Sequence, residues 1–118
     1  MIRELKKSDL MLKGGKILIK GVSQPGILLV WASWCGHCNR FKPVYNELAQ
    51  KLGAGFEVLA LEDTQIANAN VTNAIGVQGF PTIKFVDAFG NIVGDYNGDR
   101  SMDDLLKHIC KFYHHCAR

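Results

Sequence analysis

Apolar and polar positions follow one another in blocks that predict alternating strands and helices. Residues 27–32 are apolar on both faces, as in a central strand covered on both sides, and residues 56–61 predict a second buried strand. Between them, apolar residues spaced three and four apart over residues 39–52 predict a helix with one buried face. Pro43 lies inside this pattern, so we expect a kink there.

The second half of the chain predicts a short helix, a hairpin and a last helix. Residues 68–75 predict the short helix, which Gly76 closes, and residues 82–86 and 92–96 predict the two strands of the hairpin. Ser101 is a favourable N-cap for a helix whose apolar face recurs every third or fourth residue. This order predicts an α/β domain with a central mixed sheet flanked by helices.

The first residues have a weaker pattern with two interpretations. Two short apolar runs, residues 10–13 and 16–20, flank a Gly-Gly pair and predict an extra N-terminal hairpin. A short helix capped by Ser8 or Asp9 is the alternative.

Length and composition agree with a single domain. The chain has 118 residues, of which 47% are hydrophobic and 21% are charged, which is ordinary globular usage. We expect one domain over residues 1–118, with an irregular N-terminal extension at residues 1–26 and a catalytic core at residues 27–115. The net charge of +3 comes from basic residues near the N-terminus. They lack the dense stripe with interleaved aromatic side chains that a nucleic-acid site needs, so they indicate a solvated face.

The N-terminal residues do not resemble a signal peptide, because charged residues alternate with single apolar ones and no apolar segment follows. We expect a cytoplasmic protein as the sequence is written, or a protein of the endoplasmic reticulum lumen if a presequence has been removed. The apolar run at residues 27–32 is too short to span a membrane, so we expect no membrane partner.

Two cysteines separated by two residues stand at the predicted start of a helix, directly after a buried strand. Unpaired N–H groups and the helix dipole stabilise an anion at this position, which favours the thiolate of Cys35. Cys38 lies one turn further along, close enough to form a disulfide with Cys35 and to resolve a mixed disulfide. We expect Gly36 to let the backbone close tightly, and His37 to donate a hydrogen bond or positive charge to the Cys35 thiolate.

The other interpretation of a Cys-x-x-C pair is half of a zinc site, which needs two further ligands. Cys110 and Cys116 form no matching pair, so we expect no metal and no cofactor. For these two residues three alternatives stay open: inert or surface thiols, a second disulfide, or a metal site shared with the neighbouring histidines.

The segment Trp34-Cys35-Gly36-His37-Cys38, together with Gly79-Phe80-Pro81-Thr82, resembles the catalytic domains of protein disulfide isomerases in the thioredoxin superfamily. Residues 96–101 also look like the Tyr-x-Gly-x-Arg-[Ser/Thr] stretch of these isomerases. The resemblance covers residues 27–109 and implies a thioredoxin fold.

The resemblance also implies a substrate site formed by Trp34, Gly79, Phe80 and Pro81. It implies a cis peptide bond between Phe80 and Pro81 that faces the thiols. Backbone groups beside this proline would pair with an extended substrate segment, and the proline would keep metal ions off the thiol pair.

The sequence departs from this family at one buried ion pair. The isomerases carry an acidic residue six positions before the first cysteine as a proton acceptor for the second thiol, with a lysine partner on the next strand. Leu29 and Ala60 occupy these two positions. Because both are apolar, no unpaired charge is left buried, and we expect slow escape from mixed disulfides.

Together these patterns predict a thiol–disulfide oxidoreductase or isomerase that acts on protein disulfides. Cys35 would attack as a thiolate and Cys38 would resolve the mixed disulfide. The expected partners are proteins or peptides with disulfides or thiols, and a redox donor or acceptor protein or glutathione; we expect no nucleic-acid partner and a monomer. The alternatives are a general thioredoxin-like disulfide reductase, and a non-catalytic peptide-binding or redox-sensing module.

Overall fold

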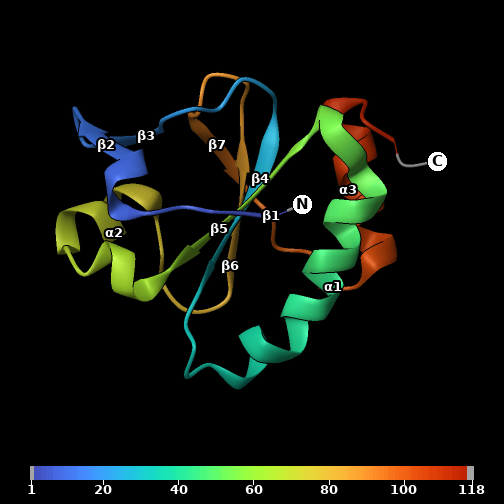
Figure 1. Cartoon of the computed structure of the whole chain (residues 1–118), viewed down its shortest axis with the longest axis horizontal. Helices are drawn as coiled ribbons and strands as arrows, with labels where there is room; N and C mark the ends of the chain where they lie inside the picture. The colour runs from blue at the N-terminus through green and yellow to red at the C-terminus, as the bar shows by residue number, and fades with distance from the viewer. Residues whose placement is uncertain (1, 117–118) are drawn as a thin grey trace.

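The computed structural model of the chain describes residues 2–116. Five strands form a central mixed sheet in the order β1-β5-β4-β6-β7 (Figure 1). β1 and β4 run parallel to β5, whereas β6 is antiparallel to β4 and β7 is antiparallel to β6. The strands are β1 (Ile2–Glu4), β4 (Gly26–Trp31), β5 (Glu57–Glu62), β6 (Thr82–Val86) and β7 (Ile92–Asp95). The predicted α/β class with a mixed sheet is confirmed.

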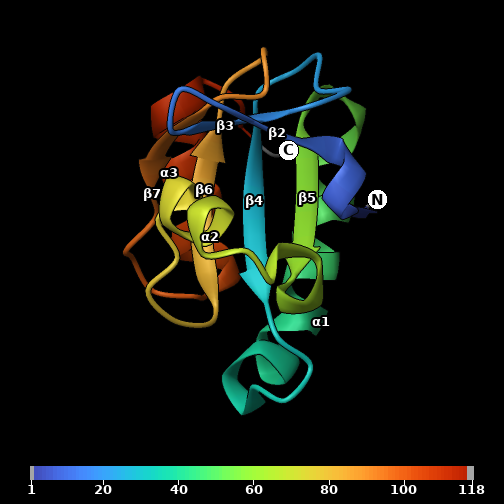
Figure 2. The ribbon, with the colours of Figure 1, turned by 90° about the vertical axis from the view of Figure 1, so that its left-hand side faces the viewer.

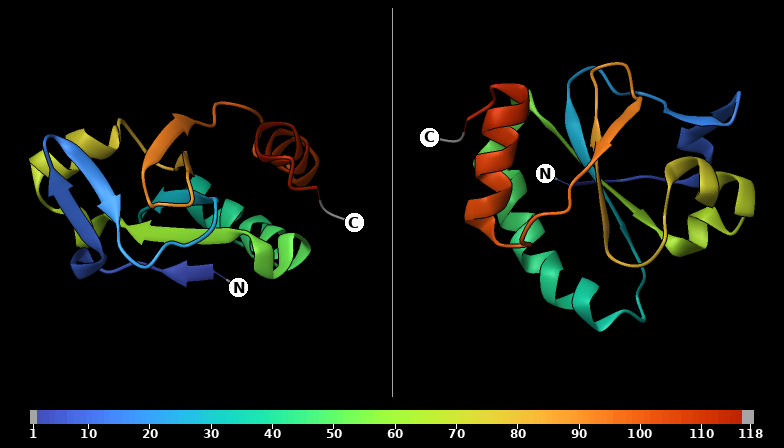
Figure 3. Two further views of the ribbon diagram at one scale, coloured as in Figure 1. Left: turned by 90° about the horizontal axis from the view of Figure 1, so that it is seen from above. Right: turned by 180° about the vertical axis from the view of Figure 1, so that it is seen from behind.

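Helices cover both faces of this sheet. α1 (Gly36–Leu52) and α3 (Met102–Tyr113) lie on one face, and α2 (Ala69–Ile75) lies on the other (Figures 1 and 2). A separate two-stranded hairpin of β2 (Leu10–Lys13) and β3 (Lys16–Ile19) lies on the same side as α2. Seen from above, the sheet separates α2 and the hairpin from α1 and α3 (Figure 3). Within residues 2–116 there are also three short 3₁₀ helices, η1 (Lys7–Asp9), η2 (Gly53–Gly55) and η3 (Asp63–Ile66).

A hydrophobic core lies on each face of the central sheet, which explains why β4 is apolar along its length. Ile27 and Leu29 face the cluster formed with α1 and α3, whereas Leu28 and Val30 face the cluster formed with α2 and β3. All four side chains are fully buried. Successive strand residues point to opposite faces, so a strand covered on both sides must be apolar at every position.

The structure shows how the predicted Ser101 cap and the predicted kink at Pro43 are formed. The last helix begins after Ser101, whose hydroxyl accepts a hydrogen bond from the Asp104 N–H, as expected for an N-cap. α1 continues through Pro43, and its axis bends along its first half (Figure 1). α1 begins at residue 36, three residues earlier than the apolar pattern indicates, because the first turn carries the thiols instead of periodic apolar residues.

Contrary to the irregular extension expected at residues 1–26, this segment holds three strands and a 3₁₀ helix. The predicted hairpin is confirmed. The alternative, a helix capped by Ser8 or Asp9, is wrong, because η1 begins after Lys6 and ends at Asp9. β1 joins the edge of the central sheet beside β5. β1 has only three residues, which show too few alternations to be recognised from sequence. Among the helices of residues 2–116, none is both long and apolar enough to cross a membrane.

Candidate active site

The two thiols of the Cys-x-x-C pair lie where β4 ends and α1 begins. Cys35 is the N-cap of α1, and Cys38 lies within its first turn. The Cys38 backbone N–H donates a hydrogen bond to the Cys35 Sγ over 3.2 Å. Both cysteines are free thiols, 7% and 0% exposed respectively. Cys35 therefore lies at a helix N-terminus, as the sequence predicts.

The surroundings push the pKa values of the two thiols in opposite directions. The pKa of Cys35 is lowered, chiefly by a hydrogen bond from the Cys38 thiol and further by the backbone N–H groups of Cys38 and His37, although burial opposes the shift. Burial and the hydrogen bond to Cys35 raise the pKa of Cys38 to about 11. This geometry favours a thiolate on Cys35 that accepts a hydrogen bond from a neutral thiol on Cys38.

The segment before β6 lies against the first thiol. The peptide bond between Phe80 and Pro81 is cis, as the resemblance implies. In its protonated form, the Cys35 thiol donates a hydrogen bond of 3.6 Å to the Phe80 carbonyl, which is part of this peptide bond. The Phe80 side chain packs on the small cluster of Ala32, Cys35 and Cys38. Gly79 precedes it, and its carbonyl accepts a hydrogen bond from the Thr82 hydroxyl over 2.6 Å, which closes the turn.

The Trp34 side chain is exposed and lies beside the thiol loop, against Phe80. Its side chain is 71% exposed, and its ring meets that of Phe80 edge-on at a centroid distance of 5.6 Å. The indole Nε1 donates a hydrogen bond to the Asp63 carboxylate over 3.0 Å. The other carboxylate oxygen of Asp63 is buried and has no hydrogen-bond partner.

Asp63 is a residue that the sequence reasoning missed. It follows directly after β5, and Glu62 at the end of β5 pairs in register with Trp31 at the end of β4. The carboxyl ends of parallel strands meet at one edge of a sheet, so this topology could have pointed to a polar side chain beside the thiol loop.

Two expectations about the residues between the thiols differ from the structure. Among the hydrogen bonds of residues 2–116, none joins the His37 ring to the Cys35 sulfur; the ring Nδ1 accepts a hydrogen bond from the Arg40 guanidinium over 2.9 Å. The His37 backbone N–H donates to Cys35 and lowers the pKa of that thiol. Gly36 lies in ordinary helical backbone, and an added Cβ would only contact Arg40 at 3.7 Å. A tight turn therefore does not require glycine here.

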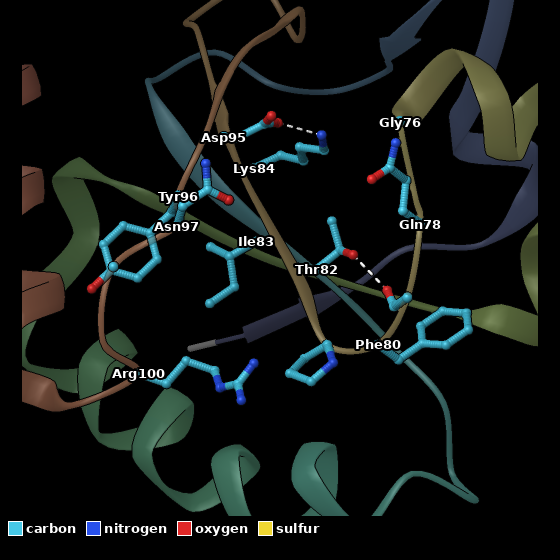
Figure 4. A pocket seen from close by; sticks show the side chains of 13 residues that line it. Gly76, Gln78, Phe80, Thr82, Ile83, Lys84, Asp95, Tyr96, Asn97 and Arg100 are labelled. Carbon is cyan, nitrogen blue, oxygen red and sulfur yellow. Dashed lines mark hydrogen bonds and ion pairs between the residues drawn. The ribbon is translucent and has the colours of Figure 1, made fainter.

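A groove of about 600 Å³ extends from the cis peptide bond along β6 and β7 (Figure 4). Phe80, Thr82 and Arg100 border its end near the thiols, and the paired side chains of Lys84 and Asp95 lie at the far end (Figure 4). The Arg100 guanidinium lowers the pKa of both Cys35 and Cys38 by its charge. Arg100 lies in the Tyr-x-Gly-x-Arg stretch noted in the sequence, but its effect on the thiols was not foreseen.

The other two cysteines lie at the end of α3. Cys110 and Cys116 form a disulfide, which was one of the three alternatives left open by the sequence. Within residues 2–116, no group of three or more His, Cys, Asp or Glu side chains is placed to hold a metal ion.

Comparison with known proteins places this fold and site in a family. The family model described as Thioredoxin matches residues 16–111. The chain is 38% identical over 109 residues to protein disulfide-isomerase erp38 of Neurospora crassa, which covers 87% of the chain and 26% of that protein. It is 40% identical over 91 residues to protein disulfide-isomerase A3 of Gallus gallus, which covers 75% of the chain and 17% of that protein. The chain thus spans about a quarter or less of these relatives.

A solved structure shows the same fold. Thioredoxin f from spinach chloroplast matches with a TM-score of 0.68 and 24% sequence identity, over 93% of this chain and 84% of that chain. The fold, the thiol pair at a helix N-terminus and the family match over residues 16–111 agree with one another. The chain belongs to the thioredoxin family.

Proposed function

We propose that this chain is a thiol–disulfide oxidoreductase that acts on protein disulfides through Cys35 and Cys38, and that it works as an isomerase. One observation carries the proposal: the Cys35 sulfur accepts the Cys38 N–H at the start of α1 and lies 3.6 Å from the Phe80 carbonyl. A thiolate is favoured at the same point where an extended substrate segment can reach a backbone edge. Residues 27–115 would form the catalytic core.

The reaction begins with attack by the Cys35 thiolate on one sulfur of a substrate disulfide. The second substrate sulfur leaves as a thiolate and takes up a proton, and a mixed disulfide with Cys35 remains. For net reduction, Cys38 loses its proton and attacks the Cys35 sulfur, which releases the substrate as a dithiol. The two electrons gained by the substrate come from the thiols of Cys35 and Cys38, which are oxidised to a disulfide. For isomerisation, another substrate thiolate displaces Cys35 before Cys38 reacts.

The balance between these two outcomes depends on how readily Cys38 loses its proton. The pKa of Cys38 is raised to about 11, chiefly by burial, and the core position expected to hold a proton acceptor is the fully buried Leu29. A slow second attack lengthens the life of the mixed disulfide and gives other substrate thiols time to react. This supports isomerisation over simple reduction.

Trp34, Gly79, Phe80 and Pro81 would shape the substrate site in this proposal. Trp34 and Phe80 present an aromatic corner beside the thiols, and the groove that begins at the cis peptide bond has room for a polypeptide segment (Figure 4). The expected partners are proteins or peptides that bear disulfides or thiols, with glutathione or a redox protein as electron donor or acceptor.

Two assays on the same protein test the proposal. Reduction of insulin by dithiothreitol and refolding of a ribonuclease with scrambled disulfides should both be accelerated, and Cys35→Ser should abolish both effects. Acceleration of neither reaction would leave only a peptide-binding or sensing role. The reduction potential separates isomerase from reductase, because a value near about −180 mV is typical of the isomerase and one near about −270 mV of thioredoxin.

A further inference from the structure

The disulfide between Cys110 and Cys116 lies far from the proposed active site. Cys35 caps the start of α1, whereas Cys110 lies in the last part of α3 and Cys116 follows its end. The start of α1 and the end of α3 are at opposite ends of the molecule (Figure 1). The two cysteine pairs therefore cannot exchange directly within one chain, and the second pair needs its own explanation.

The disulfide closes a clasp at the end of α3, which we define as residues 110–116. α3 ends at Tyr113, and His114 takes a left-handed backbone conformation with φ of 56°, which turns the chain back toward Cys110. Non-glycine residues seldom take this conformation, and His is among those that take it most often. The disulfide and the left-handed His114 together hold the reversal.

The clasp places His115 on the end of α1. The His115 Nε2 donates a hydrogen bond of 3.0 Å to the carbonyl of Leu52, the last residue of α1. Such a carbonyl has no partner inside its own helix. The His115 ring also packs on Phe56, with centroids 5.2 Å apart. The disulfide therefore fastens α3 to the far end of the helix whose first turn carries the active-site thiols.

The two sulfurs of this disulfide differ in access. Cys110 is half-buried in α3, whereas Cys116 is exposed beyond the helix end. A thiolate from solvent can reach the Cys116 sulfur, and Cys110 then becomes the leaving group. Thiol–disulfide exchange depends on such access.

We propose that Cys110–Cys116 is a second redox site, a reducible disulfide whose reduction releases the C-terminal clasp from α1. A dithiol reductant attacks the Cys116 sulfur through one thiolate, and Cys110 leaves and takes up a proton. The second thiol of the reductant then attacks the reductant sulfur that is bonded to Cys116, and Cys116 is released as a thiol. The clasp gains two electrons and two protons, and the reductant becomes a disulfide. His115 then loses the constraint that holds it against Leu52 and Phe56.

The test uses the full chain with Cys35→Ser and Cys38→Ser, so that only the clasp can exchange. Excess dithiothreitol under native conditions should make both clasp cysteines reactive toward a thiol-alkylating mass label. The melting temperature should fall by about 5–15 °C, as expected for loss of a short disulfide loop in a domain of this size. In the same background, further changes of Cys110 and Cys116 to Ser should make the melting temperature insensitive to dithiothreitol.

A second pair of variants shows whether the clasp is what the reductant releases. His115→Ala should shrink the shift caused by dithiothreitol, because the contact with Leu52 and Phe56 is already lost. His114→Asn is the matched control and should keep the full shift, since Asn tolerates the left-handed conformation. Clasp cysteines that stay unlabelled in excess dithiothreitol, or a melting temperature unchanged by their reduction, would overturn the proposal. Neither result depends on activity at Cys35.

Discussion

Leu29 on β4 lies directly opposite Ala60 on β5 in the parallel register, and both side chains are completely buried. The resemblance to the isomerases implies an acid and its lysine partner at these two positions, and the strand register brings the two positions side by side. Two apolar partners leave no buried charge to compensate. They also leave the core beside α1 without a carboxylate that could take the proton of Cys38.

The first prediction concerns this missing proton acceptor. Leu29→Glu should speed the resolution of a Cys35 mixed disulfide at pH 7 by about tenfold, because a positioned general base accelerates a proton transfer by at least that factor. Stability should fall by about 2–4 kcal/mol, since a carboxyl group replaces a packed side chain. Stopped-flow tryptophan fluorescence of a preformed mixed disulfide measures the rate. Leu29→Gln is the control, which should lose similar stability without the rate gain; equal rates for the two variants would reject the idea.

The pH dependence of alkylation follows from the opposite pKa shifts of the two thiols. Because the pKa of Cys35 is lowered, its reaction with iodoacetamide should reach half of its maximum rate at a pH below the usual cysteine range. Cys38 should stay unreactive until the pH approaches about 11. Mass spectrometry of samples quenched at each pH assigns the rate to each cysteine. A common midpoint for both would contradict the structure.

The same shifts predict how stability changes with pH in the reduced protein. The thiol of Cys38 is favoured in the folded state, so its contribution is fully present below the unfolded pKa of about 8.5 and is lost as pH rises through about 11. Cys35 has the opposite sign: its contribution is present above the unfolded pKa and is lost as pH falls through its lowered folded value. Urea unfolding of Cys38→Ala should therefore show a smaller decline of stability between about pH 8.5 and 11 than the reduced parent protein.

Arg100 should tune the thiols from across the groove. Arg100→Gln removes a charge that lowers the pKa of both Cys35 and Cys38, so alkylation of Cys35 at pH 7 should slow by about two- to threefold. Arg40→Gln is the matched control, because Arg40 contacts the His37 ring and not the thiol. An effect of the control as large as that of Arg100→Gln would assign the tuning to His37 instead.

Asp63 should position Trp34 for substrate. Asp63→Ala removes the acceptor of the indole N–H, and KM for a protein disulfide should rise by about two- to tenfold, the value of one hydrogen bond. The rate with a small aromatic disulfide, which does not need the Trp34 side chain, should stay the same. Stability should not fall, because one oxygen of this carboxylate is buried without a partner. The exposed neighbour Thr64 offers a control in Thr64→Ala.

Tyr45 should contribute to stability and not to activity. Its buried hydroxyl donates to the carbonyls of Leu59, at 2.6 Å, and Ile27, at 3.2 Å, and so connects α1 to both central parallel strands. Tyr45→Phe should lower the free energy of unfolding by about 1–3 kcal/mol, because it leaves buried acceptors without this donor. Urea denaturation measures the loss, and the insulin assay should give an unchanged kcat at a temperature where the variant is folded.

Local features of this protein could be read from the sequence because they depend on near neighbours. The apolar run of residues 27–32, the helical spacing after Cys38 and the Ser101 cap each act within one or two turns of chain, and each has its counterpart in the structure. The edge strand β1 was missed because three residues carry too little pattern.

Contacts between distant segments were decided only by the tertiary structure. Nothing in the sequence around Trp34 indicates that Asp63 holds its indole, or that the His37 ring prefers Arg40 to the Cys35 sulfur. Likewise, the sequence leaves three alternatives open for Cys110 and Cys116. The structure shows a disulfide, because the left-handed backbone of His114 turns the chain back toward Cys110. The chemistry of a thiol pair at a helix start is set by local dipoles and N–H groups. Which side chains surround that pair depends on where the strands end in space.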